Sequence, residues 1–184
     1  MEILDVWNEL GNKTNQSKSR DECHQKGLWH QTVHVWVINS KNELLIQQRQ
    51  LDRESNPGKW DISAAGHIPR GQSPTEAALR ELNEEVGISI TPSEIEYLGR
   101  VKHIYGRGES WINKEYQEVY LHRGSYELEQ LNYQESEVSS IKWIDINKFW
   151  KWSQSHSDNL VSHPQEYALV KSILDSLTDK KSPP

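Results

Sequence analysis

Three glutamates at helical spacing are the residues of this chain best suited to chemistry. Glu81, Glu84 and Glu85 lie at positions i, i+3 and i+4, so a helix would place all three carboxylates on one face. Like charges gathered on one face repel one another, and folding alone gives no reason to collect them. A hard divalent cation does, because Mg²⁺ and Mn²⁺ prefer oxygen ligands, and Mg²⁺ usually shares them with substrate phosphates. The alternative is a solvated helix face, and the flanking residues decide between the two.

The flanking sequence predicts a helix over residues 73–86 that packs against a core. Ser73 and Glu76 form a capping-box pattern, and Pro74 suits the first helical position. Gly87 is placed to end the helix in a left-handed conformation. At about 100° per residue, an apolar stripe lies roughly a quarter-turn from the carboxylates and consists of Ala78, Leu79, Leu82 and Val86. The helix should therefore bury this stripe and turn its acids along the boundary of a cleft.

The segment from Gly66 to Ile88 resembles the Nudix box, G-x5-E-x7-R-E-U-x-E-E-x-G-U, where U is a bulky aliphatic residue. The matching residues are Gly66, Arg80, Glu81, Leu82, Glu84, Glu85, Gly87 and Ile88. The resemblance implies an α/β/α sandwich with a mixed central sheet, and hydrolysis of a nucleoside diphosphate linked to another moiety or of a related organic diphosphate. It also implies that the three glutamates and the backbone carbonyl of Ala65 bind Mg²⁺ or Mn²⁺. Arg80 would hold the glutamate face by ion pairing, because its rigid fork suits carboxylates.

One position departs from the box, since its first Glu falls on Gln72. A glutamine cannot act as a base and is a weaker metal ligand, although its carbonyl can accept a hydrogen bond. The departure leaves the strength of metal binding open.

A wider resemblance, over about residues 2–150, is to the isopentenyl-diphosphate isomerase branch of the same superfamily. It rests on the runs 30–49 and 57–67 together with the N-terminal segment. The isomerases use a cysteine in the strand before the box, where this chain reads Ser-Ala-Ala-Gly with Ala64 and Ala65; the sole cysteine is Cys23. Alanine cannot replace an acid–base or nucleophilic thiol. The isomerase glutamate is expected to fall on Tyr116, so we expect an isomerase-like architecture with hydrolase chemistry.

Three histidines match positions that bind a second metal in the isomerases: His24, His30 and His67. Imidazole suits Mn²⁺ and Zn²⁺, and the alternative is that these are ordinary strand and loop residues. The remaining histidines without such a context are expected at the surface and are His103, His122, His156 and His163.

Further candidates lie outside the box. Glu118 sits in a predicted strand and is expected to be either an extra metal ligand or the base that activates water, and Glu115 is the second candidate for this place. For the role of base, Glu85 is the alternative. An ordinary polar strand position is the alternative for both Glu118 and Glu115. Phosphates could be held by Arg49, Arg53, Lys59 and Arg70; an exposed surface charge is the alternative for each, and the favoured one for Arg53. Trp111 is the best candidate for the wall of a substrate pocket.

Composition bounds the protein class. A chain of 184 residues suits a single domain over 1–184, and its net charge of −6 argues against an extended nucleic-acid surface. One cysteine excludes an internal disulfide framework, and no apolar run predicts a signal peptide or a membrane span, so a cytoplasmic location is the default. The oligomeric state stays open, with a homodimer as one option.

The expected elements position the box between two runs of strands. Hairpins are predicted over 3–8 with 10–16, inside an N-terminal extension of about 1–30, and over 32–38 with 43–49. Further strands are expected at 60–67, 95–105, 114–123 and 140–144, with a loop at Gly106–Gly108. A short helix should follow Asp145, and a last helix should span about 165–178 before a frayed tail. Three functions remain: a metal-dependent diphosphate hydrolase, an isopentenyl-diphosphate isomerase, and a non-catalytic Nudix-fold binding module.

Overall fold

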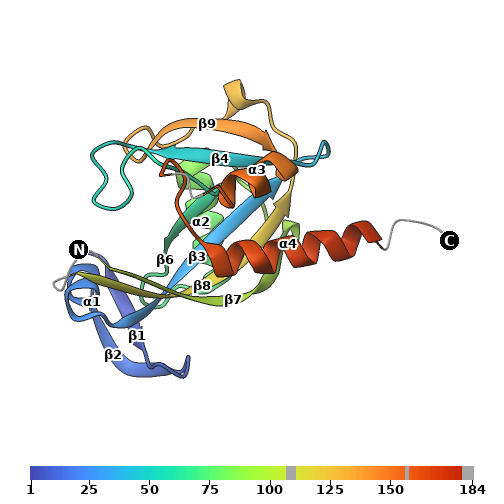
Figure 1. Ribbon diagram of the computed structural model, residues 1–184. Coiled ribbons are helices and arrows are strands. Elements are labelled where there is room, and N and C mark those ends of the chain that lie inside the picture. Colours follow the sequence, from blue (N-terminus) through green and yellow to red (C-terminus); the bar gives the residue numbers. More distant parts are fainter. Residues whose placement is uncertain (107–110, 156–157, 180–184) are drawn as a thin grey trace.

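The computed structural model describes residues 1–106, 111–155 and 158–179, and Figure 1 shows their arrangement. Within these ranges nine strands form one sheet. The strands are β1 (Ile3–Trp7), β2 (Lys13–Ser19), β3 (Trp29–Ile38), β4 (Glu43–Arg49), β5 (Trp60–Asp61), β6 (Ala64–His67), β7 (Ile95–Gly106), β8 (Ile112–Arg123) and β9 (Val138–Asp145). The helices are α1 (Arg20–Lys26), α2 (Pro74–Val86), α3 (Ile146–Ser153) and α4 (Pro164–Asp179), with short 3₁₀ turns at Pro92–Glu94 and Leu128–Gln130.

Strand β3 is the centre of a mixed sheet. It runs parallel to β8 over its whole length, and β8 continues into an antiparallel pair with β7. The first strand reaches β3 through Trp7 and Trp29, and it carries β2 on its outer edge. Strand β4 pairs antiparallel with β9 and β5. The N-terminal hairpin thus extends the same sheet that carries the box (Figure 1).

Alternation along β3 divides the core into two halves. Val33, Val35 and Val37 are fully buried against α2, whereas Trp36 and Ile38 point to the opposite face. On that face they pack with α3 and α4, which Figure 1 shows in front of the sheet. Both faces of the sheet are therefore covered by helices, which confirms the predicted α/β/α sandwich.

The sheet splits between β3 and β4. The two strands pair at Ile38 and Leu44 and then diverge, after which β6 takes the edge of β3 and β5 the edge of β4. Buried Ser63 lies in the split: its hydroxyl accepts a hydrogen bond from Val37 N–H at 2.8 Å and donates one to the Leu45 carbonyl at 2.6 Å. This single side chain satisfies backbone groups that neighbouring strands would otherwise pair, so the split stays open.

Most predicted elements are confirmed, with two differences. The expected strand 60–67 is interrupted at residues 62 and 63, where the chain crosses the split. Helix α1 was not expected, although Ser19 caps it by accepting the Glu22 N–H at 3.2 Å and Gly27 ends it with φ 58°. The frayed tail and part of the Gly106–Gly108 loop lie outside the described residues. None of the described helices combines the length and apolarity needed to cross a bilayer.

Candidate active site

Helix α2 is capped at both ends, and this sets the direction of its glutamates. Ser73 N–H donates to Glu76 Oε2 at 2.9 Å, and Glu76 N–H donates back to Ser73 Oγ at 3.3 Å. Gly87 ends the helix at φ 73°, where a Cβ would lie 2.7 Å from the backbone nitrogen of Asn132. Side chains cannot occupy that space, so only glycine allows the helix to stop here.

Two of the three box glutamates are buried at the edge of β6. Glu85 Oε2 accepts hydrogen bonds from Gln47 Nε2 at 2.7 Å and from Ala65 N–H at 2.8 Å. The Glu81 carboxylate lies so close to the backbone of Gly66 that a Cβ there would overlap it. The close approach explains why the box begins with glycine.

Arg80 connects the carboxylates to the loop before the helix. Its guanidinium lies 2.9 Å from Glu81 Oε1 and 2.8 Å from Glu84 Oε2, and it donates to the His67 carbonyl at 3.1 Å. Its Nε donates to Gln72 Oε1 at 3.3 Å. The position that departs from the box thus contacts the arginine, and its amide carbonyl supports the orientation of the guanidinium.

The buried glutamates resist ionisation in the metal-free chain. Burial raises the pKa of Glu81 to about 7, against the opposing effect of Arg80. Burial, assisted by the charge of Glu81, raises the pKa of Glu85 to about 8, although the hydrogen bonds from Ala65 and Gln47 oppose the rise. Two carboxylates that are this close together and buried from water ionise together only if a positive charge compensates them. The donor set therefore fits a divalent cation.

A cavity of about 740 Å³ opens beside these carboxylates, and its wall draws residues from both faces of the sheet. Glu81 and Glu84 line one part, and Trp111 lines another. The basic residues on the wall are Arg20, Arg49, Arg53, Arg80 and Lys59. Acidic and basic groups thus face one space, which suits an anion that is bridged to a metal.

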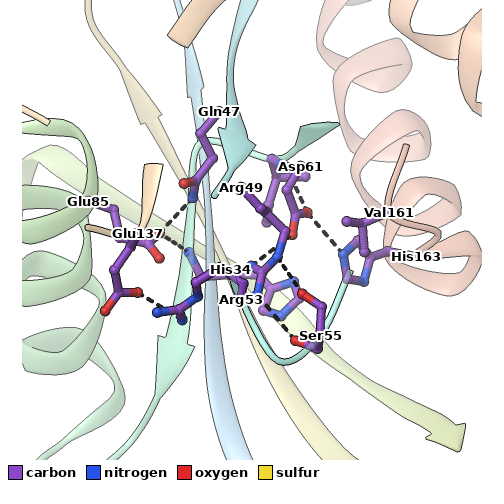
Figure 2. Close-up of polar contacts among 12 residues, drawn as sticks. His34, Gln47, Arg49, Arg53, Ser55, Asp61, Glu85, Glu137, Val161 and His163 are labelled. Carbon is purple, nitrogen blue, oxygen red and sulfur yellow. Dashed lines mark hydrogen bonds and ion pairs between the residues drawn. The ribbon is translucent and has the colours of Figure 1, made fainter. Parts of the chain in front are cut away.

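Two of the basic residues are held in place by neighbours, as Figure 2 shows. Arg49 donates to the Ser55 carbonyl at 3.1 Å and to Ser55 Oγ at 3.2 Å. Arg53 lies 2.9 Å from Glu137, so the expectation that it is merely an exposed surface charge is wrong. Arg20 lines the same wall and was missed, because it belongs to the unexpected helix α1.

Arg70 does not share this location. Its backbone N–H donates to the Ile3 carbonyl at 2.8 Å, and it is not among the described residues that line the cavity.

The three histidines assigned by resemblance come together. Ligand nitrogens of His24, His30 and His67 all lie within 4.8 Å of one another. His30 Nδ1 lies 2.9 Å from the Leu28 carbonyl and His67 Nδ1 lies 3.4 Å from Glu2, which leaves the Nε2 atoms directed elsewhere. In the described part of the chain, the buried Nε2 atoms of all three lack a hydrogen-bond partner. Burial lowers the pKa of each ring, to about 4 for His24, so the imidazoles are neutral and available as ligands.

Strand β8 turns Glu118 away from this cavity. Glu118 Oε1 accepts hydrogen bonds from Gln31 Nε2 and Arg100 Nε, both at 2.6 Å, and Oε2 accepts one from the Tyr97 hydroxyl at 2.8 Å. Of the described residues that line the cavity, Glu115 is one and Glu118 is not. The structure therefore does not bring the preferred candidate to the site, because strand alternation places it on the face opposite to Glu115.

Glu115 lies beside the histidine trio instead. It accepts hydrogen bonds from Asn113 Nδ2 at 2.6 Å and Gln117 Nε2 at 3.0 Å. Although burial opposes ionisation, any positive charge on His30, His34 or His67, together with the hydrogen bond from Asn113, lowers the pKa of Glu115. Tyr116 points the other way and donates to the Asn8 carbonyl at 2.9 Å, so it takes no part in the cavity.

A second buried cluster was not anticipated. His34, His163, Glu166 and Asp61 meet where the start of α4 approaches β3 and β5. The expectation of a surface position is wrong for His163, which is 7% exposed, and for His122, which is 4% exposed; His156 lies outside the described residues. Glu166 lies on the same buried face of α4 as Val170. A carboxylate on an apolar helix stripe is a sequence feature that could have predicted this buried cluster.

Sequence comparisons place this geometry in a family. The NUDIX domain matches residues 28–162. A Nudix hydrolase of Clostridium acetobutylicum is 33% identical over 162 residues, which cover 86% of this chain and 77% of that protein. The isopentenyl-diphosphate Delta-isomerase of Dinoroseobacter shibae is 32% identical over 126 residues, covering 68% of this chain and 69% of the isomerase. Nudix hydrolase 3 of Arabidopsis thaliana is 36% identical over 152 residues, but the match spans 80% of this chain and only 20% of that longer protein.

Among solved structures, DR0079 from Deinococcus radiodurans has the same fold. Its TM-score is 0.71 at 17% identity, and the match covers 92% of this chain and 98% of that one. The chain therefore belongs to the Nudix superfamily of hydrolases, and its relatives include isopentenyl-diphosphate isomerases.

Proposed function

We propose that the chain hydrolyses a diphosphate linkage in a nucleoside diphosphate derivative or a related organic diphosphate, with Mg²⁺ or Mn²⁺. One observation carries the proposal: two box carboxylates, those of Glu81 and Glu84, face the same cavity as a basic wall. A diphosphate bound between them would have a metal on one side and guanidinium groups on the other. That arrangement matches charge developing on a leaving phosphate.

Glu81, Glu84 and Glu85, with the carbonyl of Ala65, would hold the ion. When bound, Mg²⁺ supplies Lewis-acid charge neutralisation at the phosphate oxygens. Arg80 keeps two of the carboxylates directed to this point, through contacts of 2.9 Å with Glu81 and 2.8 Å with Glu84.

Arg49, Arg53 and Lys59, with Arg20, would bind the phosphate oxygens that the metal leaves free. The forks of Arg49 and Arg53 are already oriented by Ser55 and Glu137, which reduces the entropy lost on binding.

Proton transfer from the attacking water needs a carboxylate beside the metal. Glu85 does not line the cavity among the described residues, but it lies on the helix face of Glu81 and Glu84, which do. Glu85 is our candidate, because a neighbouring cation would favour its ionised form at neutral pH. Glu118 was the other candidate, and three donors already occupy its oxygens at 2.6–2.8 Å. That environment favours a structural role for Glu118, which links β8 to Tyr97 and Arg100 of β7.

We propose a second metal position at His24, His30 and His67, with Glu115 beside it. Neutral imidazoles with free nitrogens suit Mn²⁺ or Zn²⁺ better than Mg²⁺. Removal of this histidine site should alter which metal supports activity while leaving the box carboxylates in place.

Isomerisation is the alternative suggested by several relatives. It requires an acid and a base on either side of a carbon chain, and the methyl groups of Ala64 and Ala65 supply neither. The Ala65 N–H is moreover occupied by Glu85. Hydrolysis needs no thiol at that position.

A panel of nucleotide sugars, dinucleotides, nucleoside triphosphates and prenyl diphosphates, with Mg²⁺, Mn²⁺ or EDTA, tests the proposal. Chromatographic separation should show monophosphate products that depend on metal. The test variant is Glu84→Gln, which removes one exposed carboxylate and should lower turnover without unfolding the chain. Absence of metal-dependent cleavage across the panel, or isomer as the only product, would overturn the assignment.

A further inference from the structure

Four buried side chains form a cluster that belongs neither to the box nor to the histidine trio. His34 comes from β3, Asp61 from β5, and His163 with Glu166 from the segment that begins α4. None is more than 7% exposed, yet His34, Asp61 and His163 border the large cavity. Figure 2 shows His163 and Asp61 on the opposite side of the drawn residues from Glu85. The cluster therefore forms part of the cavity wall opposite α2.

Three atoms of this cluster converge on one point. Glu166 Oε2 lies 2.7 Å from His34 Nδ1 and 3.8 Å from His163 Nδ1. All three ligand atoms lie within 4.8 Å of one another. His163 Nδ1 is buried and has no hydrogen-bond partner among the described residues.

The outward-facing atoms of the same side chains already have partners. Asp61 Oδ1 lies 3.1 Å from His163 Nε2, and Trp36 Nε1 donates to Glu166 Oε1 at 2.6 Å. Arg49 in turn lies 3.6 Å from Asp61. A carboxylate on the far nitrogen of an imidazole, and a hydrogen bond to the far oxygen of a carboxylate, are the supports that orient metal ligands.

A purely structural reading explains only part of this arrangement. An imidazolium–carboxylate pair of His34 with Glu166 would attach α4 to the sheet, and their 2.7 Å contact fits it. That pair does not account for His163, whose buried Nδ1 faces the same carboxylate oxygen without a hydrogen bond. Leaving a buried nitrogen unpaired costs about 1–3 kcal/mol.

We propose that His34 Nδ1, His163 Nδ1 and Glu166 Oε2 bind a zinc-class transition-metal ion, with Asp61 positioning His163. Two imidazoles and one carboxylate suit Zn²⁺ in a site that keeps one position open. The hydrogen between His34 and Glu166 would be released when the ion binds. Because two of the ligands border the cavity, the open position would be reachable by an oxygen of the cavity's occupant.

The test uses the full chain with the trio disabled by His30→Asn and His67→Asn, in excess Mg²⁺ to occupy the box. Zinc is titrated against a chromophoric chelator, and Co²⁺ absorption reports the ligand geometry. We expect the protein to bind one equivalent of zinc. His163→Asn and Glu166→Gln should each weaken the zinc affinity by about 100-fold or more. Asp61→Asn should weaken binding by about 10–100-fold, since it removes only a supporting contact.

His103→Asn is the matched control, because His103 has its ring 5.5 Å from that of His163 but is not in the ligand set. It should keep the zinc equivalent. Anomalous diffraction at the zinc edge from wild-type crystals makes the test independent of variant folding, with a peak expected between the three ligand atoms. Zinc peaks at the box or the trio alone, or equal zinc affinity in His163→Asn and His103→Asn, would overturn the proposal.

Discussion

Replacing Glu85 with glutamine should stabilise the metal-free chain while it abolishes activity. Glu85 is 4% exposed, and its pKa is raised to about 8 from the usual 4.5. The folded chain therefore keeps a proton here between pH 4.5 and 8, where the unfolded chain has lost it. Folding binds this proton, so the free energy of unfolding falls as pH rises through that range. Glutamine resembles the protonated form and cannot ionise.

The size of the effect follows from the pKa difference. Each pH unit above 4.5 costs the wild type about 1.4 kcal/mol relative to Glu85→Gln. The difference is about 3 kcal/mol at pH 7 and levels off at about 5 kcal/mol above pH 8. Because Glu81 is present in both proteins, the difference between the two curves reports mainly on Glu85.

Urea denaturation in EDTA at pH 5.5, 7 and 8.5 measures these curves. Glu84→Gln is the control: its carboxylate is half-exposed, so loss of its ion pair with Arg80 should shift stability only slightly and should not reproduce the pH slope expected for Glu85. Added Mg²⁺ should raise the stability of the wild type at pH 8.5 and have little effect on Glu85→Gln. Parallel curves for wild type and Glu85→Gln would show that burial does not hold a proton at this residue, and the reasoning would fail.

Three other predictions concern the box and its neighbours. In Gly66→Ala the new methyl group should overlap the Glu81 carboxylate and lower the free energy of unfolding by about 1–3 kcal/mol. Adding Glu81→Ala should restore the thermal midpoint but not turnover. An unchanged midpoint in the single variant would contradict the contact. Gln72→Glu should tighten apparent Mg²⁺ binding by about fivefold, or about 1 kcal/mol, by adding a charge beside Arg80; overlapping metal titrations would exclude this. Incubation with isopentenyl diphosphate and Mg²⁺ or Mn²⁺ should give no dimethylallyl isomer, because Ala65 carries no thiol; isomer at enzymatic rates would overturn the hydrolase reading.

Local signals predicted the helix well and the strand break poorly. Ser73, Pro74 and Gly87 act on their own neighbours, so the helix bounds of 74–86 agree with the sequence within a residue. The interruption at Ser63 depends on Val37 and Leu45, which lie far away in the chain, and no local pattern reports such a contact. The break in turn opens the split through which the site is built.

The extra acid shows a different limit. Alternation correctly placed Glu118 opposite to Val119, but it does not say which face of β8 carries the site. Because the cavity draws on both sides of the split sheet, the acid that enters it is Glu115, on the face away from α2. Arg20 and His163 were missed for a related reason, since each enters the cavity from a segment remote from the box.

The cavity wall reaches beyond the segment that defines the family. Residues 28–162 match the NUDIX domain, yet Glu2, Arg20 and His24 precede that span, and His163 follows it. A chain shortened to the matching span would keep every box carboxylate and lose parts of the wall on two sides. We expect the flanks to contribute to substrate choice together with Arg49, Arg53 and Lys59, which lie inside the matching span. Relatives with identical boxes could therefore differ in substrate through their flanks as well, so a comparison of substrates should include the flanks.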